Sequence, residues 1–529
     1  MQQNATPRDD PGPGWRLLAA LCLAVVALVL GTRILAPSDL NQNQDQSKTI
    51  AFTLDAAVNG NWALPRDGSG ELTRKPPLVN WIGAVPVLAG WHAEPALKLP
   101  SVLAGVGTVV AAAVGGLVLF RRLGDHGSDA GDAALARHAP ACALAAGAVW
   151  IACPSSIKHV YFMRPDMLFT LWLTIGWASA TVLVTGPTPK RPRTTAVVMW
   201  TAAGLAALTK GPMALLIPAY ALLAGLLIAD HPERAHWRAR ASRTARVGWW
   251  WGVPLMLAMP GGWLLAAWRA DPAHVEGVLL GQELGSRVPG SGESGALAKI
   301  WYALHRGVPG LLFSRFAPWG VLTILAVITK PSRAWLGHPT GPASLWVVMV
   351  LVVNVLTAGR SGSYLMPAYP AAGILAVYAL ARIIAGREGT RMRAAPAWVA
   401  LAALLVAACV GGREAFFSRA ARTGDGETLK AFARDAEALV GDDPVVFIRT
   451  GDLPLASLMG RAQAGEPDAS SLAGAVWLVV AGDLGPIPAA VSKLESAPVL
   501  LPGRPGEDRS GQRATIRLLR AGPNAPTPP

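Results

Sequence analysis

The chain has 529 residues, of which 52% are apolar and only 15% are charged. A soluble protein carries about 25% charged residues, so this composition excludes a soluble enzyme, a disordered scaffold and a secreted disulfide-stapled domain. The net charge of +14 comes from basic residues in short segments between apolar runs, which favours membrane orientation over nucleic-acid binding. The four cysteines have no metal-type spacing and indicate no disulfide framework.

Apolar runs of transmembrane length follow one another through most of the chain. The run at 15–35 is too long for a signal-peptide core, so we expect an uncleaved first span after a cytoplasmic tail at 1–14. Further runs lie at 96–120, 138–153, 165–186, 195–209, 212–229, 248–268, 307–329, 341–358, 364–384 and 396–412. We therefore expect an all-α polytopic membrane domain over residues 15–412, with about 11 to 13 transmembrane helices.

The distribution of lysine and arginine predicts the orientation of these spans. If the N-terminus is cytoplasmic, every strongly basic short loop lies on the cytoplasmic side. The opposite side then receives a first loop at 36–95, a second loop at 269–306 and the segment after residue 412. Abundant arginine and alanine are typical of a GC-rich bacterial genome, so we expect a multi-pass protein of the bacterial inner (cytoplasmic) membrane, with a periplasmic C-terminal domain.

The C-terminal segment has the pattern of a small water-exposed domain. Residues 445–449, 476–480 and 514–519 read as strands between glycine, proline and aspartate, and residues 428–440 read as a helix. We expect a small α/β domain over 413–501, followed by a Pro-rich, partly disordered tail at 502–529.

The first external loop holds a carboxylate and cations near the expected membrane boundary. Apolar residues recur at helical spacing over 50–58, which predicts a short amphipathic helix on the membrane surface with Asp45 just ahead of it. The double proline at 76–77 predicts extended backbone that holds Arg74 and Lys75 at headgroup level.

Such a pair suits transfer from a lipid phosphate to an acceptor. The carboxylate can take or orient the acceptor's proton, and the cation can hold the phosphate as it leaves. The spacing equally fits an N-cap aspartate and a lysine that binds anionic headgroups. From the residues alone, both interpretations stay open.

Six short motifs occur in a consistent order. They are Asp45-Gln46-x-Lys48, Gly60-x-Trp62, Lys75-Pro76-Pro77-Leu78, Arg164-Pro165-Asp166, Leu208-Thr209-Lys210-Gly211-Pro212 and Ser363-Tyr364-Leu365-Met366-Pro367. With them the chain resembles the bacterial aminoarabinose lipid A transferases (ArnT-like) and protein O-mannosyltransferases. These are integral-membrane glycosyltransferases of the GT-C fold that use polyprenyl-phosphate sugars. The resemblance spans residues 36–375 and implies the GT-C fold here.

The resemblance also implies roles for individual residues. Asp45 matches the family's proposed catalytic carboxylate, and Asp166 matches an acidic residue at the external end of a span. The residues implied in binding the donor phosphate are Lys75, Arg164, Arg360 and Tyr364. Further possible contacts to donor or acceptor are Lys48, Arg74, Lys210, Glu283 and Arg306.

Some positions depart from the family pattern. Gln46 stands where the family has a second acid, and Arg74 stands where aminoarabinose-type relatives have the glutamate before Lys-Pro-Pro. Gln282-Glu283 replaces a histidine near a glutamate. In such relatives these acidic and histidine positions form a metal site. We therefore name no metal ligands and no certain cofactor here, although a divalent metal remains possible.

The expected function is transfer of a sugar from a polyprenyl-phosphate donor, with inversion, to a lipid, glycan or protein acceptor on the external face. Two other classes stay open. A lipid or solute transporter predicts paired charges at the membrane midplane and inverted repeats. A non-catalytic assembly factor for envelope polysaccharide predicts that replacing Asp45 has no effect on activity.

Overall fold

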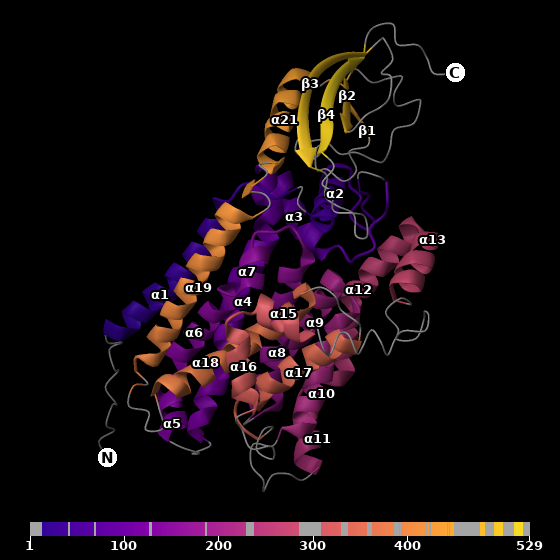
Figure 1. The fold of residues 1–529 in the computed structure, drawn as a ribbon. Coiled ribbons are helices and arrows are strands. Elements are labelled where there is room, and N and C mark those ends of the chain that lie inside the picture. Colours follow the sequence, from indigo (N-terminus) through magenta and orange to yellow (C-terminus); the bar gives the residue numbers. More distant parts are fainter. Residues whose placement is uncertain are drawn as a thin grey trace, which may run out of the picture.

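The computed structural model describes residues 13–521 apart from several segments. These are 41–42, 68–69, 126–129, 186–187, 229–236, 285–307, 329–336, 357–361, 386–390, 392, 419–420, 423–424, 442, 444, 449–476, 482–490 and 501–512. The described chain forms a bundle of helices with a small sheet domain at one end (Figure 1).

The regular elements described in the first half of the chain are helices, joined by loops of which one holds an isolated bridge between Arg66 and Leu72. The elements of this half are α1 (Pro13–Ile34), α2 (Gln44–Val58), α3 (Leu78–Leu88), α4 (Ala93–Asp125), α5 (Ala130–Arg137), α6 (Ala139–Ile151), α7 (Pro154–His159), α8 (Pro165–Val184), α9 (Pro192–Lys210), the 3-10 turn η1 (Pro212–Leu215) and α10 (Leu216–Leu227). The second half continues with α11 (Trp237–Ala245), α12 (Trp249–Ala270), α13 (Pro272–His274), the π-helix η3 (Val275–Leu284), α15 (Val308–Arg315), α16 (Trp319–Ile328), α17 (Gly341–Leu356), the 3-10 helix η5 (Gly362–Ala368), α18 (Tyr369–Ala385) and α19 (Ala395–Phe417).

Each expected span contains a helix, so the all-α membrane domain is confirmed. Five described helices are long and apolar enough to cross a membrane: those starting at Trp15, Glu94, Pro165, Ser363 and Ala395. The bent pair α5 and α6 would make a sixth, and α3, η1 with α10, α16 and α17 are shorter apolar helices. The expected number of about eleven spans stays a prediction.

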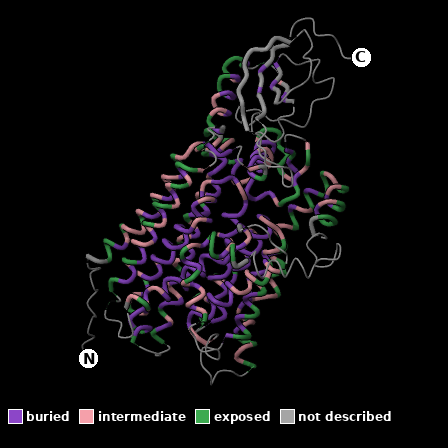
Figure 2. Tube along the Cα trace, viewed as in Figure 1, coloured by how far each residue is buried: buried purple, intermediate pink, exposed green. Residues whose placement is uncertain are grey.

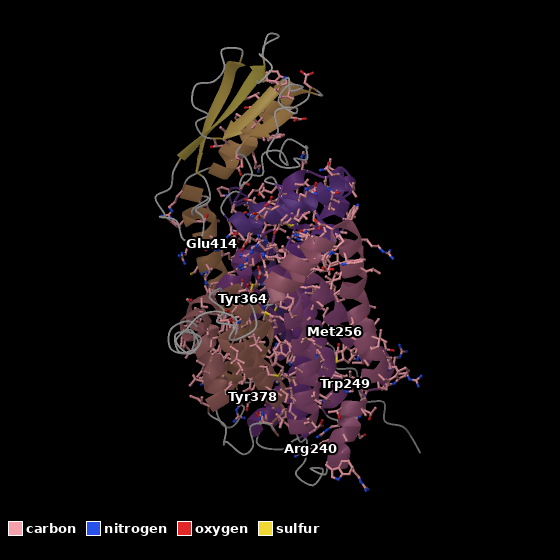
Figure 3. All side chains as sticks on the ribbon, turned by 90° about the vertical axis from the view of Figure 1, so that its right-hand side faces the viewer. Arg240, Trp249, Met256, Tyr364, Tyr378 and Glu414 are labelled. Atoms are coloured by element: carbon pink, nitrogen blue, oxygen red, sulfur yellow. The ribbon has the colours of Figure 1, made fainter. Side chains whose placement is uncertain are left out.

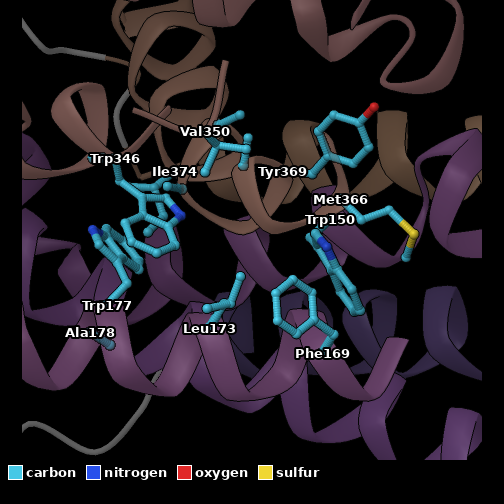
Figure 4. Close-up of a cluster of buried hydrophobic side chains, with 14 of the residues drawn as sticks. Trp150, Phe169, Leu173, Trp177, Ala178, Trp346, Val350, Met366, Tyr369 and Ile374 are labelled. Carbon is cyan, nitrogen blue, oxygen red and sulfur yellow. The ribbon is translucent and has the colours of Figure 1, made fainter. Parts of the chain in front are cut away.

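The core of the bundle is built where α8 packs against α4 and α9. Its interior is almost fully buried, as Figure 2 shows. Large aromatic side chains fill it: the ring of Tyr220 meets that of Trp346 edge-on at 5.4 Å, and Trp177 lies beside Trp346 (Figure 4). Because protein interiors are close-packed, this rigid core fixes the helix ends that carry the site.

The double proline differs from its expected conformation. Pro77 has φ −92° and ψ 0° and is the N-cap residue of α3, so the extended segment ends one residue earlier. Proline fixes φ near the helical value and is tolerated where a helix begins. The segment therefore places Lys75 just before a helix, whose presence at 78–88 the sequence pattern did not predict.

The C-terminal domain is a four-stranded sheet with one covering helix. Its elements are α21 (Asp425–Val440), β1 (Val445–Ile448), β2 (Trp477–Ala481), β3 (Val491–Leu500) and β4 (Arg513–Ala521). The strand order is β1-β2-β4-β3, with β1 parallel to β2 and the other pairs antiparallel. Apolar residues of α21 pack on the sheet, among them Leu429 and Phe432 against Phe447 and Ile516.

Two domain boundaries in the structure differ from the expected ones. Helix α19 continues to Phe417, beyond the expected end of the membrane domain at 412. Strand β4 lies within the sheet between β2 and β3, so residues 513–521 belong to the domain and not to a tail beginning at 502. The strand expected at 514–519 is thus present as β4, and the proline content around it placed the expected start of the tail too early.

The two ends of the bundle differ in character. Helices α2 and α3 lie at the end that carries the sheet, and the basic helix α11 lies at the other (Figure 1). In Figure 3, Tyr364 and Glu414 lie nearer the sheet end and Arg240 lies at the opposite end. Helices α2 and α3 of the first loop and the basic helix α11 thus occupy opposite ends of the bundle, and the orientation in a membrane stays a prediction.

Candidate functional site

Asp45 lies in the first turn of α2. The helix is capped by Asn43, whose side chain accepts a hydrogen bond from the backbone N–H of Gln46 at 3.3 Å. Asp45 is therefore not the cap, and its carboxylate, half-exposed at the surface, is free to meet other groups. A negative charge in the first turn of a helix is also favourable.

Two cations flank this carboxylate. Arg164, the N-cap residue of α8, donates to Asp45 Oδ2 at 2.9 Å. Lys75 Nζ lies 3.7 Å from Asp45 Oδ1 and is itself about half-exposed. Residues separated by 119 positions in sequence thus meet at one point.

A second carboxylate lies behind the first. Asp166 is buried, with Arg164 Nε at 3.2 Å from one oxygen and Lys210 paired with the other. The ammonium of Lys210 also lies 4.2 Å from the centre of the Tyr364 ring, a cation–π contact. Asp166 therefore orients two cations, whereas Asp45 is open to a ligand.

Two cavities meet at Asp45. The larger, about 510 Å³, is lined by site residues and by apolar side chains of α12 and η3. The smaller, about 340 Å³, is lined by polar residues of the first loop together with Phe52, Leu72 and Val79. The residues shared by both linings are Asp45, Arg74, Lys75, Pro76 and Pro165.

Lys48 is held away from Asp45. Its ammonium lies 2.9 Å from Glu71 and 3.2 Å from Asp67. Burial by itself would lower the pKa of Lys48, but the hydrogen bonds and charges of these two acids outweigh it and raise the pKa. Lys48 lines only the smaller cavity, so it stabilises the loop and contributes to the wall of that cavity.

The structure describes only some of the other residues expected to contact donor or acceptor. Arg74 lines both cavities and makes no ion pair with another described residue. Glu283 lies in η3, but its side chain is outside the described residues, as are Arg360 and Arg306 entirely. Their expected roles stay predictions.

The sequence motifs missed two parts of the site. The apolar wall comes from α12 and η3, including Met256, Trp263 and Leu279, and nothing in their composition distinguishes them from other span residues. Gln46 was noted only as a departure from the family. It is fully buried, and its Oε1 accepts from the backbone N–H of Met163 at 2.8 Å.

The described residues do not offer a metal site. No group of three or more His, Cys, Asp or Glu side chains among them could hold a metal ion. At the position before Lys75, the cationic Arg74 cannot ligate one.

Comparison with known proteins finds similarity in structure. No family model and no curated protein sequence matches the chain. Among solved structures the chain matches GT-C proteins, and it has the GT-C fold.

One match is ArnT from Cupriavidus metallidurans, in a crystal structure bound to undecaprenyl phosphate. The TM-score is 0.61 and the identity 17%, over 96% of this chain and 98% of that one. Its apo structure gives a TM-score of 0.60. A further match is the Archaeoglobus fulgidus oligosaccharyltransferase in complex with Zn and sulfate, with a TM-score of 0.52 and 13% identity over 88% of this chain and 67% of that one. The expected ArnT-like GT-C fold is thereby confirmed.

Proposed function

We propose that this chain is a membrane glycosyltransferase that moves a sugar from a polyprenyl-phosphate donor to an acceptor, with inversion. The observation that carries the proposal is the position of Asp45. It lies between Arg164 and Lys75 at the point shared by an apolar-walled and a more polar cavity. A transferase needs such a point, where a lipid-borne donor and a second substrate can meet.

The larger cavity suits a lipid donor. Three leucines in its lining, Leu215, Leu257 and Leu280, are exposed by 55%, 54% and 44%. Leu257 lies on α12, and Leu215 and Leu280 lie on the short helices η1 and η3. A polyprenyl chain that lies along this exposed apolar wall stays in an apolar environment. The undecaprenyl phosphate bound to ArnT supports the same class of lipid.

The cations at the inner end of this cavity suit the donor phosphate. Lys75, Arg164, Lys210 and Arg74 all line it, against the two carboxylates of Asp45 and Asp166. Charge-assisted hydrogen bonds to a phosphate are among the stronger ones. Arg164 and Lys210 are pre-oriented by Asp166, which reduces the reorganisation needed as charge develops on the leaving phosphate.

The reaction is a single displacement. An acceptor oxygen or nitrogen in the smaller cavity attacks the anomeric carbon, and the bond from that carbon to the phosphate oxygen breaks. The electron pair leaves with the polyprenyl phosphate, which Lys75 and its neighbours stabilise. Asp45 orients the acceptor and takes its proton once phosphate has drawn Lys75 away from it. Attack opposite to the leaving group inverts the anomeric carbon.

The proposed partners follow from the two cavities. They are a polyprenyl-phosphate sugar, a lipid, glycan or protein acceptor, and the surrounding membrane lipids. The site lies at the end of the bundle that carries the sheet domain (Figure 1). We place this end in the periplasm and the bundle in the bacterial inner membrane, since the basic helix α11 lies at the opposite end.

The proposal is tested with purified full-length protein and a panel of labelled undecaprenyl-phosphate sugars. Donor consumption, by transfer or hydrolysis, is measured for wild type, for Asp45→Asn and for Asp435→Asn, a matched change on the exposed face of α21. We expect consumption by wild type and Asp435→Asn, and a loss of about 10²–10⁴-fold in Asp45→Asn. Equal consumption by all three, or none by wild type with any donor, contradicts the proposal.

A further inference from the structure

A second group of charges lies buried behind the site, where the first loop meets α4. Asp39 accepts from Lys98 at 2.5 Å and from Arg33 at 2.7 Å. Lys98 is only 1% exposed and also lies 3.0 Å from Glu94. Its ammonium faces the ring of Tyr161 at 4.5 Å. Every charge in this group has an opposite partner, as burial requires.

The group continues into the C-terminal domain. Lys430 of α21 lies 2.8 Å from Glu94, and Glu427 accepts from the backbone N–H of Ser38 at 2.8 Å. The helix approaches so closely that a Cβ on Gly426 would lie 1.9 Å from the Ser38 carbonyl oxygen. This contact needs a glycine, so α21 is docked in one defined position.

At its other end the group reaches the site through Gln46. The Nε2 of Gln46 donates to the Asp39 carbonyl at 2.7 Å, and its Oε1 accepts from Met163 N–H at 2.8 Å. Gln46 follows Asp45, and Met163 precedes Arg164. One buried amide thus holds the backbone beside both members of the Asp45–Arg164 pair.

The chemistry of an amide explains why glutamine stands here. A glutamine side chain both donates and accepts, and this position uses both functions. A carboxylate would lose the donor and would face both the Asp39 carbonyl oxygen and Asp39 Oδ1, which lies 3.4 Å from Nε2. The presence of Asp39 therefore favours the amide over an acid at position 46.

We propose that the C-terminal α/β domain is a positioning element for the transfer site. It acts through the chain Lys430, Glu94, Lys98, Asp39 and Gln46, which keeps Asp45 and Arg164 aligned only while α21 is docked. None of the five residues lines either cavity, so each works through Asp45 and Arg164. This inference rests on the proposed transferase function and adds a role for the domain.

The test uses four full-length variants. Lys430→Met removes the contact with Glu94, and Gln46→Glu breaks the link to the site. Lys430→Arg keeps the charge, and Arg434→Met is the matched control, because Arg434 lies on the same helix and is 78% exposed. For each we measure kcat, KM, the Kd for undecaprenyl phosphate and amide hydrogen exchange at residues 43–50 and 160–166.

We expect Lys430→Met and Gln46→Glu to lower kcat by about 10- to 100-fold, the effect of misplacing a reacting group by about 1 Å. The Kd should stay within about twofold, because the cavity that binds the lipid is unchanged. Hydrogen exchange in the two segments should rise. Lys430→Arg should restore both readouts, and Arg434→Met should match wild type.

Two results overturn the inference. One is unchanged exchange in Lys430→Met, which means that docking does not hold the site. The other is raised exchange with wild-type kcat, which means that the alignment has no role in transfer. A wild type that consumes no donor while Lys430→Met still shows raised exchange overturns the proposed function instead, and with it the catalytic part of this inference.

Discussion

The molecule contains two groups of charged side chains that differ in their access to water. Around Asp45 the carboxylate and Lys75 are each about half-exposed, and their separation of 3.7 Å is longer than a hydrogen bond. Around Lys98 the ammonium is 1% exposed and hydrogen-bonds Asp39 at 2.5 Å. A loosely paired, open group can exchange its partners for a ligand, whereas a closely paired, buried group can only hold its position.

The difference extends to the energetics. Exposed ion pairs contribute about 0–1 kcal/mol, so a phosphate can displace Lys75 from Asp45 at little cost. Breaking a buried pair by removing one partner costs about 3–5 kcal/mol. The group around Asp45 is therefore suited to binding and reacting with a ligand, and the group around Lys98 is suited to holding the site in position. Substitutions in each group test this difference.

The largest expected effect is on activity, at Arg164. Arg164→Met removes the cation shared by Asp45 and Asp166, which we propose orients Asp45 and stabilises the leaving phosphate. We expect kcat to fall by about 10²–10³-fold, as for loss of one group that stabilises transition-state charge. Arg164→Lys should recover only part, since a lysine cannot reach both carboxylates in the planar fork geometry.

Single-turnover transfer from a labelled undecaprenyl-phosphate sugar measures this effect. Arg66→Met is the control, because Arg66 belongs to the first loop but lines neither cavity. A wild-type transfer rate in Arg164→Met would show that Arg164 takes no part in transfer.

The next effect is on stability, at Lys98. Lys98→Met leaves Asp39 and Glu94 buried without their shared cation, and we expect the free energy of unfolding to fall by about 3–5 kcal/mol. Lys75→Met removes a half-exposed lysine from the half-exposed carboxylate of Asp45 and should cost about 0–1 kcal/mol. Unfolding in detergent measures both, and similar losses would contradict the distinction between the two groups.

The sequence predicted the elements that depend on neighbouring residues better than those that depend on residues far away along the chain. Apolar runs are local signals, and each of the five described helices that are long and apolar enough to cross a membrane coincides with one of them. Strand β3 was not predicted because Val491–Leu500 contains polar residues and a proline, and its pairing with β4 is irregular between Lys493 and Glu495. That strand is defined by its partner and not by its own pattern.

The same distinction holds for the site. The motifs named Asp45, Lys75 and Arg164, which lie together in the structure, because each belongs to a recognisable local pattern; their roles stay predictions. Asp39 and Lys98 are 59 residues apart, and Glu94 and Lys430 are 336 apart, in no motif. Lys98 lies near the start of the apolar run at 96–120, where a charged residue suggests function, but the sequence analysis did not single it out because nothing local identifies its partners.

A smaller effect is expected on lipid binding, at Lys75. Lys75→Ala removes one charge-assisted contact to the donor phosphate, and such contacts contribute about 1.5–3 kcal/mol. We expect the Kd for undecaprenyl phosphate to rise at least about tenfold. Titration of the purified protein with undecaprenyl phosphate measures this change, with Arg66→Ala as the control. An unchanged Kd would show that Lys75 does not hold the phosphate.

The smallest effect is expected from pH on the buried group. Burial by itself would raise the pKa of Asp39, but Lys98 and Arg33 outweigh it and lower the pKa below its ordinary value of 3.8. Burial would lower the pKa of Lys430, but Glu94 and Glu427 raise it above its ordinary value of 10.5.

The stability from Asp39 is therefore lost only as pH falls through its lowered pKa, and that from Lys430 only as pH rises through its raised pKa. Between about pH 5 and 9 we expect a Tm that these two groups do not change. A fall in Tm within this window that disappears in Asp39→Asn would contradict the assignment.

The most direct test of the proposed transfer site is a structure of the full-length protein with undecaprenyl phosphate bound. We expect the phosphate between Lys75 and Arg164, beside Asp45, with the polyprenyl chain along α12 and η3. We also expect the buried group around Lys98 to be unchanged. A lipid bound elsewhere, for example at the basic end near α11, or a phosphate paired with Lys98, would contradict the proposal.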